Sequence, residues 1–250
     1  MTGKRLTGQV VLVTGAGQGI GRGIALALAK EGAQVVLAGR TKAKCDLVVD
    51  EIESAGGAAL SLACDVTDRS QVDRMVSETV EQFGSLHGLV NNAVSSDQQL
   101  LEEVTDADVE LSWRSGAMGT LYAMQAALPH LRAAGGGSIV NFGSSTAVYG
   151  NATFGAYAMA KEAIRGLSRV AAREWGRYGI RVNVVVPVAM SPASVEFSQK
   201  NPERFDAMRN SLALRRVGDC ETDIGRAVVS LMSDDLSYLT GDTLMLTGGM

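Results

Sequence analysis

Apolar residues alternate along this chain between two kinds of segment. Short runs rich in β-branched residues are separated by longer stretches in which apolar residues recur at helical spacing. Near-continuous apolar runs are typical of parallel strands covered on both faces, and the stretches between them suit crossover helices. The strand-like runs comprise residues 10–13, 35–38, 58–63, 88–90, 138–142, 182–186 and 243–246, and the helical stretches comprise 20–30, 42–54, 70–83, 106–131, 154–178 and 222–232.

This alternation predicts an α/β fold, a Rossmann-like, doubly wound parallel sheet of about seven strands with helices on both faces. No linker, repeat or low-complexity tract interrupts the pattern, so residues 1–250 are expected to form a single domain. Residues 190–216 differ in composition, with Pro192 and Pro202 among polar residues. We expect this segment to form a mobile substrate cap over a pocket, with an ordinary surface excursion as the alternative.

Composition excludes several classes of function. The 250 residues include 23 Lys and Arg against 27 Asp and Glu, a net charge of −4, and 5% of them are aromatic. Such a chain lacks the basic surface and aromatic platforms of a nucleic-acid-binding protein and the positive charge that an anionic membrane attracts. No apolar run approaches the roughly 18 residues of a membrane span, and charged residues precede the first apolar run. We expect a soluble cytoplasmic protein.

The cysteines and histidines predict no metal site. Cys45, Cys64 and Cys220 are odd in number and widely spaced, so they fit neither a disulfide framework nor a set of metal ligands. They are consistent with a reducing compartment. His87 and His130 lie far from each other in the sequence and far from the motifs described below.

A glycine-rich turn follows the first strand. The sequence Thr14-Gly-Ala-Gly-Gln-Gly-Ile-Gly21 leads from that strand directly into a helix. Glycine removes Cβ atoms where a chain turns sharply and approaches a pyrophosphate, and the N-terminus of the helix directs unpaired amides at the same place. This context predicts a dinucleotide site, with a merely tight strand–helix turn as the alternative. The residues of the turn predicted to bind the cofactor are Gly15, Gln18, Gly19, Ile20 and Gly21.

The end of the second strand indicates which dinucleotide binds. An acidic residue about 20 positions past the glycines would accept a hydrogen bond from the adenosine ribose 2′-hydroxyl and repel a 2′-phosphate. The chain instead has Gly39 and Arg40 there. A guanidinium holds a phosphate bidentately, so Arg40 favours NADPH over NADH. A solvated arginine at the head of the next helix is the alternative interpretation.

Three further residues form a candidate reacting centre. Tyr157 and Lys161 are four positions apart, which places both side chains on one face of a helix. A nearby ammonium is expected to lower the pKa of the phenol from about 10 and make Tyr157 a usable acid or base. Ser144, at the end of the fifth strand, is expected to hydrogen-bond a substrate oxygen held between it and the tyrosine. Each residue alone has a simpler explanation, as a surface pair or a helix cap.

With these motifs in this order, the chain resembles the short-chain dehydrogenase/reductase family along nearly its whole length. Several of the motifs are degenerate singly, but their order and spacing together are highly specific. The matching pieces are the turn at 14–21, Asp65-Val66, Asn91-Asn-Ala93, Ser144, Tyr157-x-x-x-Lys161, and the stretch from Arg181-Val-Asn183 to Pro187.

The resemblance implies roles for these residues. Tyr157 would donate the proton in carbonyl reduction, Ser144 would orient the substrate oxygen, and Lys161 would also bond the nicotinamide ribose. Family members usually form homodimers or homotetramers through the helices of the segments that begin at 106 and 154. The other implied cofactor contacts are Asp65 and Val66 at the adenine, Asn92 and Ala93 along the cofactor path, and Pro187 and Val188 beside the nicotinamide carboxamide.

Three positions depart from the family pattern. Val94 and Val188 stand where the family usually has glycine. Gly116 stands where the family typically has an asparagine that holds a water chain to the active-site lysine. Without that amide, we expect proton resupply to use a different water arrangement, with Ser112 or Ser115 as candidates, and the enzyme to be slow or specialised.

The leading hypothesis is an NADPH-dependent carbonyl reductase, reversible as an alcohol dehydrogenase, in which Tyr157 serves as acid or base. One domain would carry both the dinucleotide site and the catalytic site. Aliphatic ketones, acyl thioesters, sugars and steroids all remain open as substrates. The alternative is a dinucleotide-binding protein of low activity that acts as a sensor or assembly subunit, which the changes at Val94, Gly116 and Val188 motivate.

Overall fold

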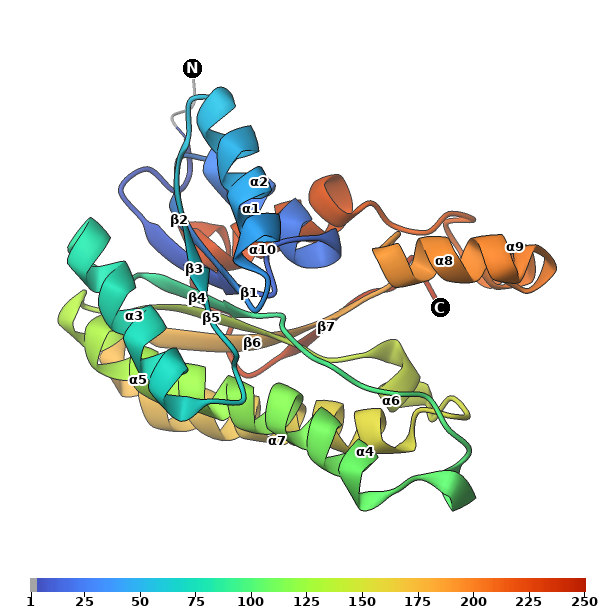
Figure 1. The fold of residues 1–250 in the computed structure, drawn as a ribbon. Coiled ribbons are helices and arrows are strands. Elements are labelled where there is room, and N and C mark those ends of the chain that lie inside the picture. The colour runs from blue at the N-terminus through green and yellow to red at the C-terminus, as the bar shows by residue number, and fades with distance from the viewer. Residues whose placement is uncertain (1–3) are drawn as a thin grey trace.

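One parallel sheet forms the centre of the molecule in the computed structural model, which describes residues 4–250. Its strands are β1 (Val10–Thr14), β2 (Gln34–Gly39), β3 (Ala58–Ala63), β4 (Gly88–Asn91), β5 (Gly137–Phe142), β6 (Ile180–Pro187) and β7 (Thr243–Leu246). All seven run parallel in the order β3-β2-β1-β4-β5-β6-β7 (Figure 1). The strand order reverses between β1 and β4, and sheets of this kind bind ligands at that switch point.

Helices cover both faces of this sheet, which confirms the predicted fold class. The helices are α1 (Gly19–Lys30), α2 (Lys42–Ser54), α3 (Arg69–Phe83), α4 (Asp106–Ser112), α5 (Gly119–Ala133), α6 (Ser145–Tyr149), α7 (Gly155–Trp175), α8 (Pro192–Lys200), α9 (Pro202–Ser211) and α10 (Arg226–Met232). Figure 1 shows α1, α2 and α10 on one face, and α3, α5 and α7 on the other. Among the described helices, none combines the length and the apolar character needed to cross a membrane.

Alternation along each strand divides the core into two clusters. In β1, Val11 and Val13 pack in the cluster beneath α1 and α10, whereas Leu12 packs in the opposite cluster with α3 and α5. Successive side chains of a strand point to opposite faces, so a strand buried on both faces is apolar throughout. The near-continuous apolar runs of the sequence follow from this double burial.

The predicted helix at 106–131 is helical throughout but not uniform. A π-helical turn, η2 (Trp113–Met118), separates α4 from α5 and contains Gly116. Turns of this kind are frequent at functional sites because they redirect side chains within a helix. A second π-helical turn, η4 (Cys220–Gly225), leads into α10.

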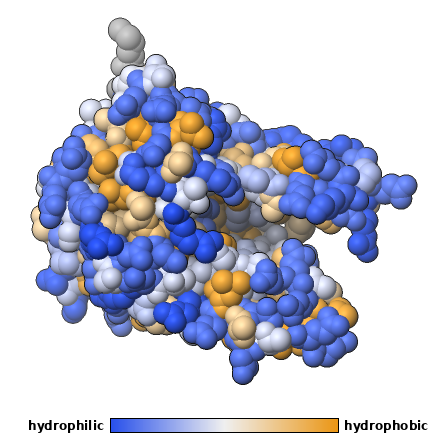
Figure 2. Space-filling model, viewed as in Figure 1, coloured by the Kyte–Doolittle hydropathy of each residue, from blue (hydrophilic) through white to orange (hydrophobic). Residues whose placement is uncertain are grey.

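The segment at 190–216 contains two helices, α8 and α9. Each begins with a proline, whose missing N–H costs nothing in the first helical turn. Neither helix has a buried residue, but Leu212, which follows α9, is completely buried. The two helices project from the sheet in Figure 1, and Figure 2 shows a hollow between them and the lobe that carries α4 and α6.

Candidate active site

The glycine-rich turn after β1 is closely packed. Gly15 and Gly19 have φ angles of 65° and 55°, a backbone region that glycine adopts readily. A Cβ on Gly21 would stand 2.2 Å from the carbonyl oxygen of Gly15, so a side chain there would displace the turn. Asn92, just after β4, fixes the turn because its Nδ2 donates to the carbonyl oxygens of Thr14 and Gly15, each at 3.1 Å. The turn is therefore held rigidly with α1 behind it.

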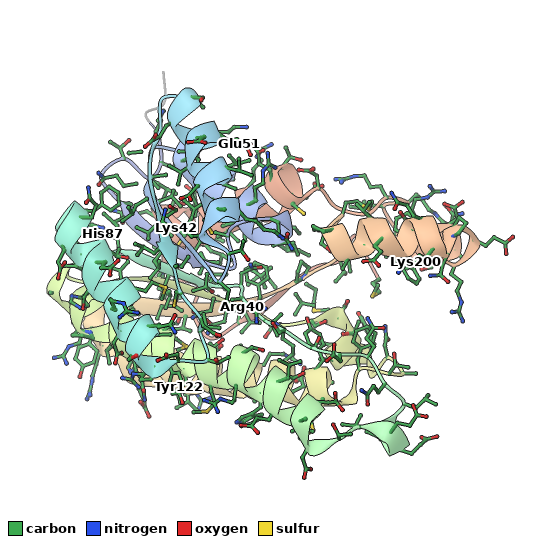
Figure 3. All side chains as sticks on the ribbon, in the orientation of Figure 1. Arg40, Lys42, Glu51, His87, Tyr122 and Lys200 are labelled. Carbon is green, nitrogen blue, oxygen red and sulfur yellow. The ribbon has the colours of Figure 1, made fainter. Side chains whose placement is uncertain are left out.

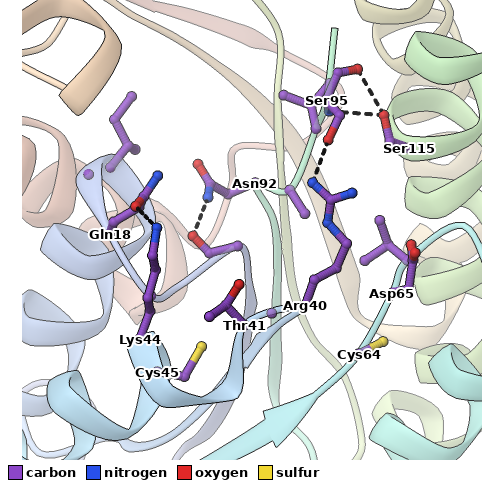
Figure 4. Close-up of a pocket in the computed structure, with 18 of the residues that line it drawn as sticks. Gln18, Arg40, Thr41, Lys44, Cys45, Cys64, Asp65, Asn92, Ser95 and Ser115 are labelled. Carbon is purple, nitrogen blue, oxygen red and sulfur yellow. Dashed lines mark hydrogen bonds between the residues drawn. The ribbon is translucent and has the colours of Figure 1, made fainter. Parts of the chain in front are cut away.

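A cleft of about 440 Å³ lies in front of this turn (Figure 4). It brings together residues from the ends of β1, β2, β3 and β4, and the start of α8 closes one side of it. Five of the predicted cofactor residues lie outside its lining, namely Gly21, Tyr157, Lys161, Pro187 and Val188. The predicted cofactor residues that line it are Gly15, Gln18, Gly19, Ile20, Arg40, Asp65, Val66, Asn92 and Ala93.

Two cations lie in the lining of this cleft. Arg40 Nη2 donates to Ser95 Oγ at 3.0 Å, and Lys44 Nζ donates to Gln18 Oε1 at 2.8 Å (Figure 4). A Cβ on Gly17 would stand 2.8 Å from Lys44 Cβ, so the glycine allows the lysine stem to lie against the turn. Arg40 lies near the centre of the molecule in Figure 3, between the two layers of helices.

Lys44 was missed by the sequence analysis. A lysine in the first turn of α2 resembles an ordinary solvated helical residue, and its contact with Gly17 depends on how α2 packs. The available signal was its spacing of four residues from Arg40, which suggests a second cation near the end of β2.

Asp65 and Val66 are anchored after β3. The Asp65 backbone N–H donates to Gln71 Oε1 at 3.0 Å, and Asp65 Oδ1 accepts from the Thr67 N–H at 2.9 Å. Val66 is buried, and a Cβ on Gly119 would stand 3.0 Å from its Cγ2. The end of β3 is thereby packed against the start of α5 and held at the cleft wall.

Ser144, Tyr157 and Lys161 come together at the carboxyl end of β5. Lys161 Nζ donates to the carbonyl oxygen of Phe142 at 2.7 Å and lies 5.6 Å from the centroid of the Tyr157 ring. The lysine and the tyrosine therefore lie on the same side of α7. Burial lowers the pKa of Lys161 to about 8. The ammonium group is thus held near the phenol with little access to water.

The expectation that Lys161 lowers the pKa of Tyr157 is wrong for the arrangement seen here. Burial raises the pKa of Tyr157, and a hydrogen bond from Ser144 opposes that rise. The lysine donates to the Phe142 carbonyl and approaches the face of the tyrosine ring, so loss of water around the phenolate dominates. At neutral pH the phenol is protonated, which is the form that a proton donor needs.

Ser144 is also the N-cap of α6, a short helix that the sequence analysis did not predict. Its Oγ accepts from the Thr146 N–H at 3.3 Å and lies 2.7 Å from Thr146 Oγ1. A helix of this length is too short for apolar periodicity to reveal it. The capping geometry nevertheless determines where the Ser144 hydroxyl points.

Two departures from the family pattern lie beside each other. A Cβ on Gly116 would stand 3.6 Å from Val94 Cγ2 and 3.3 Å from Ala160 Cβ. The Val94 side chain therefore lies next to the position that a side chain at residue 116 would occupy. Ser115 Oγ is already engaged with neighbouring backbone groups. Ser112 Oγ is buried and has no hydrogen-bond partner within residues 4–250. Of the two serines considered for a proton path, Ser112 has the unused hydroxyl.

Comparisons with known proteins are consistent with this site. Residues 15–250 match a family model described as enoyl-(acyl carrier protein) reductase. The chain is 42% identical to a 12α-hydroxysteroid dehydrogenase from a Clostridium species, over 97% of this chain and 96% of that protein. It is 37% identical to the 3-oxoacyl-(acyl-carrier-protein) reductase FabG of Staphylococcus aureus, over 96% of each.

Solved structures show the same architecture. Levodione reductase superposes with a TM-score of 0.91 at 31% identity, covering 98% of both chains. A 7α-hydroxysteroid dehydrogenase complexed with NADH and 7-oxo glycochenodeoxycholic acid superposes with a TM-score of 0.90 at 31% identity, covering 98% of this chain and 95% of that one. The similarity therefore extends over the whole sheet and both layers of helices.

Proposed function

Because the chain belongs to the short-chain dehydrogenase/reductase family, we propose that it is an NADPH-dependent carbonyl reductase that also works in reverse as an alcohol dehydrogenase. The relatives support the general activity, oxidoreduction of hydroxyl and carbonyl groups with a nicotinamide cofactor. The observation that carries the proposal is the convergence of Ser144, Tyr157 and Lys161 at the end of the sheet that also holds the glycine-rich cleft.

The cleft fits a dinucleotide. Glycines leave the backbone of the turn open, and the N-terminus of α1 offers unpaired amides to a pyrophosphate. When bound, the nicotinamide cofactor supplies or accepts the hydride. The residues proposed to hold it are Gly15, Gln18, Gly19, Ile20 and Gly21 at the pyrophosphate, Asp65 and Val66 at the adenine, Asn92 and Ala93 along the cleft, and Pro187, Val188, Tyr157 and Lys161 towards the nicotinamide.

Tyr157 holds a proton at neutral pH, since the ordinary pKa of a tyrosine is about 10 and burial raises it. Its phenol donates that proton to a substrate carbonyl oxygen as negative charge develops there. Ser144 donates a second hydrogen bond to the same oxygen. The ammonium of Lys161 is held beside the ring of Tyr157 by its hydrogen bond to the Phe142 carbonyl, and it would bond the nicotinamide ribose. In the oxidative direction, Tyr157 removes the proton from the alcohol.

The preference for NADPH rests on Arg40 and Lys44, two cations in the cleft lining, and on the lack of a carboxylate at the end of β2, where Gly39 stands. Each cation would contribute charge-assisted hydrogen bonds to a 2′-phosphate. We expect Arg40→Ala and Lys44→Gln each to raise the KM for NADPH about ten-fold while leaving the KM for NADH nearly unchanged.

Lys42→Gln is the matched control for this experiment. Lys42 lies on the same helix but donates to Asp46 and Ser61, and it does not line the cleft. Steady-state kinetics with both cofactors measure the effect. Equal KM values for NADH and NADPH in the wild type, with no loss of preference in Arg40→Ala, would refute the NADPH assignment.

The substrate is proposed to be a bulky, largely apolar oxo or hydroxy compound, with oxosteroids as the first class to examine. Met190 and Phe197, in the segment proposed as a cap, are partly exposed. Tyr149 and Met250 are also exposed, and Tyr149 Oη donates to the Met250 carbonyl oxygen at 3.2 Å. Two relatives named as hydroxysteroid dehydrogenases support this class. The cap at 190–216 would close over such a substrate.

A panel assay tests the proposed function. Wild type and Tyr157→Phe are supplied with oxosteroids, cyclic diketones, 3-oxoacyl thioesters and sugars, and cofactor oxidation is followed with NADPH and with NADH. We expect turnover by the wild type and a loss of about 100-fold or more in the variant. Tight NADPH binding in a fluorescence titration, without turnover of any compound, would favour the low-activity sensor. Full velocity in Tyr157→Phe would exclude the proposed mechanism.

A further inference from the structure

Thr146 places a second hydroxyl beside the proposed reacting centre. Its Oγ1 lies 2.7 Å from Ser144 Oγ, and within residues 4–250 the Ser144 hydroxyl is its only hydrogen-bond partner. The Thr146 backbone N–H also donates to Ser144 Oγ, at 3.3 Å. Thr146 is half-buried in the first turn of α6, and Ser144 is 9% exposed. Two groups of one residue therefore contact the serine hydroxyl.

Counting protons assigns a direction to this contact. A serine hydroxyl has one proton to donate and two lone pairs that accept. The Thr146 N–H occupies one lone pair of Ser144. In the proposed reaction, Ser144 donates its one proton to the substrate oxygen held against Tyr157. Only a lone pair of Ser144 then remains for the Thr146 hydroxyl, so the threonine is the donor of their 2.7 Å contact.

We propose that Thr146 is a positioning residue whose hydroxyl donates to Ser144 and thereby directs the Ser144 proton at the reacting oxygen. The result is a chain of donors from Thr146 to Ser144 to the oxygen held against Tyr157. Each donor in such a chain polarises the next, so the outer hydroxyl strengthens the inner hydrogen bond. This inference rests on the proposed function, because it assigns Thr146 a part in the reaction of Ser144 and Tyr157.

The other charged and titratable groups near Tyr157 have partners of their own, so an effect of Thr146 on the pKa of Tyr157 can be measured. Lys161 faces its ring from the same helix, 5.6 Å from the centroid. On α4, Asp108 bonds Thr105, and Arg114 of the adjoining η2 pairs with a carboxylate on α4. The phenol of α6, Tyr149, donates to backbone. Burial and Ser144 are the influences that shift the pKa of Tyr157.

The experiment compares Thr146→Val with Thr146→Ser. Valine keeps the branched shape and removes the hydroxyl, whereas serine keeps the hydroxyl. We expect Thr146→Val to lower kcat about five-fold with the KM for NADPH unchanged, and to raise the pH midpoint of alcohol oxidation by about half a unit. Thr146→Ser should behave as the wild type. Thr146→Ala, which also lacks the hydroxyl, replaces the valine variant if valine lowers the melting temperature.

A double-variant cycle shows whether Thr146 acts through Ser144. In the Ser144→Ala background, adding Thr146→Val should cost no further activity. The inference is overturned if Thr146→Val matches the wild type in kcat and pH midpoint, or if Thr146→Ser is as impaired as Thr146→Val. It is also overturned if Thr146→Val lowers kcat by the same factor in the Ser144→Ala background as in the wild type. Failure of the proposed function looks different, because the wild type would then turn over no compound of the panel, or Tyr157→Phe would keep full activity.

Discussion

Lys161 is an ammonium group held almost entirely out of water. Its side chain is 2% exposed, and its hydrogen bond is to the Phe142 carbonyl. Removing a charge from water disfavours the charged form, which is why its pKa falls to about 8. The same burial raises the pKa of Tyr157. At this scale, water exclusion shifts both pKa values, downward for the ammonium and upward for the phenol.

The stability of the protein should therefore depend on pH through Lys161. Its pKa is about 8 in the folded protein against an ordinary 10.5, so between these pH values the unfolded chain binds the proton more tightly. The free energy of unfolding then rises with pH across that window, by at most about 3 kcal/mol from this group. Lys161→Met should lack that rise. Urea denaturation of both proteins at pH 7.5 and 10 gives the free energies of unfolding. The prediction is contradicted if this free energy changes by the same amount between the two pH values in both proteins.

Val94 and Gly116 should be energetically coupled, since the valine lies next to the position where a Gly116 side chain would begin. If the lost amide impairs proton resupply, Gly116→Asn should raise turnover, but the new side chain must also fit against Val94 and Ala160. We expect turnover to rise further in Val94→Gly/Gly116→Asn than in Gly116→Asn alone. Steady-state rates of the wild type, Val94→Gly, Gly116→Asn and the double variant measure the coupling. Additive effects would show that the two positions are independent.

At the scale of elements, close packing behind the cleft holds α1 in place. A Cβ on Gly23 would stand 2.4 Å from the carbonyl carbon of Cys220 in η4, and one on Gly225 would stand 2.7 Å from Ala27 Cβ. Gly23 on α1 and Gly225 on η4 therefore let the backbones of these two elements approach closely. The N-terminus of α1 is directed at the cleft by this contact, so packing on one side of the helix supports binding at its end.

Gly23→Ala should destabilise the protein for this reason. A methyl group there has no space, and overpacking of this kind costs about 1–3 kcal/mol. Gly176→Ala is the control, because Gly176 has helical backbone angles and open space at its Cβ position. That substitution should stabilise the protein by about 0.5–1 kcal/mol. Thermal or urea denaturation measures both, and a neutral Gly23→Ala would show that η4 moves away from α1 at little cost.

At the scale of the whole molecule, α7 carries an apolar stripe on its outer surface. Met159 and Val170 are 55% and 53% exposed, and a Cβ on Gly166 would meet nothing within 4 Å. With Ala163 these residues lie on one face of the helix, small in the middle and apolar at both ends. Such a face suits close approach of a second helix, which supports the proposal of a homodimer or homotetramer formed through the long helices.

Ala163→Arg should lower the molecular mass in solution, because a charged side chain in the centre of this stripe cannot be buried without a partner. Leu47→Arg is the control, since Leu47 is 64% exposed on α2, on the other face of the sheet. Sedimentation equilibrium gives the mass of each protein. A monomeric wild type, or an Ala163→Arg variant of unchanged mass, would exclude this interface.

The sequence was most informative where the signal is local. Apolar runs located every strand of the sheet, and the spacing of Tyr157 and Lys161 placed them on one side of α7. The stretch at 106–131 was less well predicted, because a π-helical turn keeps the helical spacing of apolar residues but changes the side of the helix on which the following residues lie. The five residues of α6 were missed, since they are too few to display a period.

The sequence alone determined the fold class and the order of chemical groups along one edge of the sheet. Periodicity and turn chemistry are properties of neighbouring residues, so they can be read without the tertiary structure. Only the tertiary structure decided the direction in which the pKa of Tyr157 shifts, the approach of Lys44 to Gly17 and the contact between Thr146 and Ser144. These depend on how much water each group loses and which distant backbone lies against it. Both follow from the packing of whole elements, which no local pattern specifies.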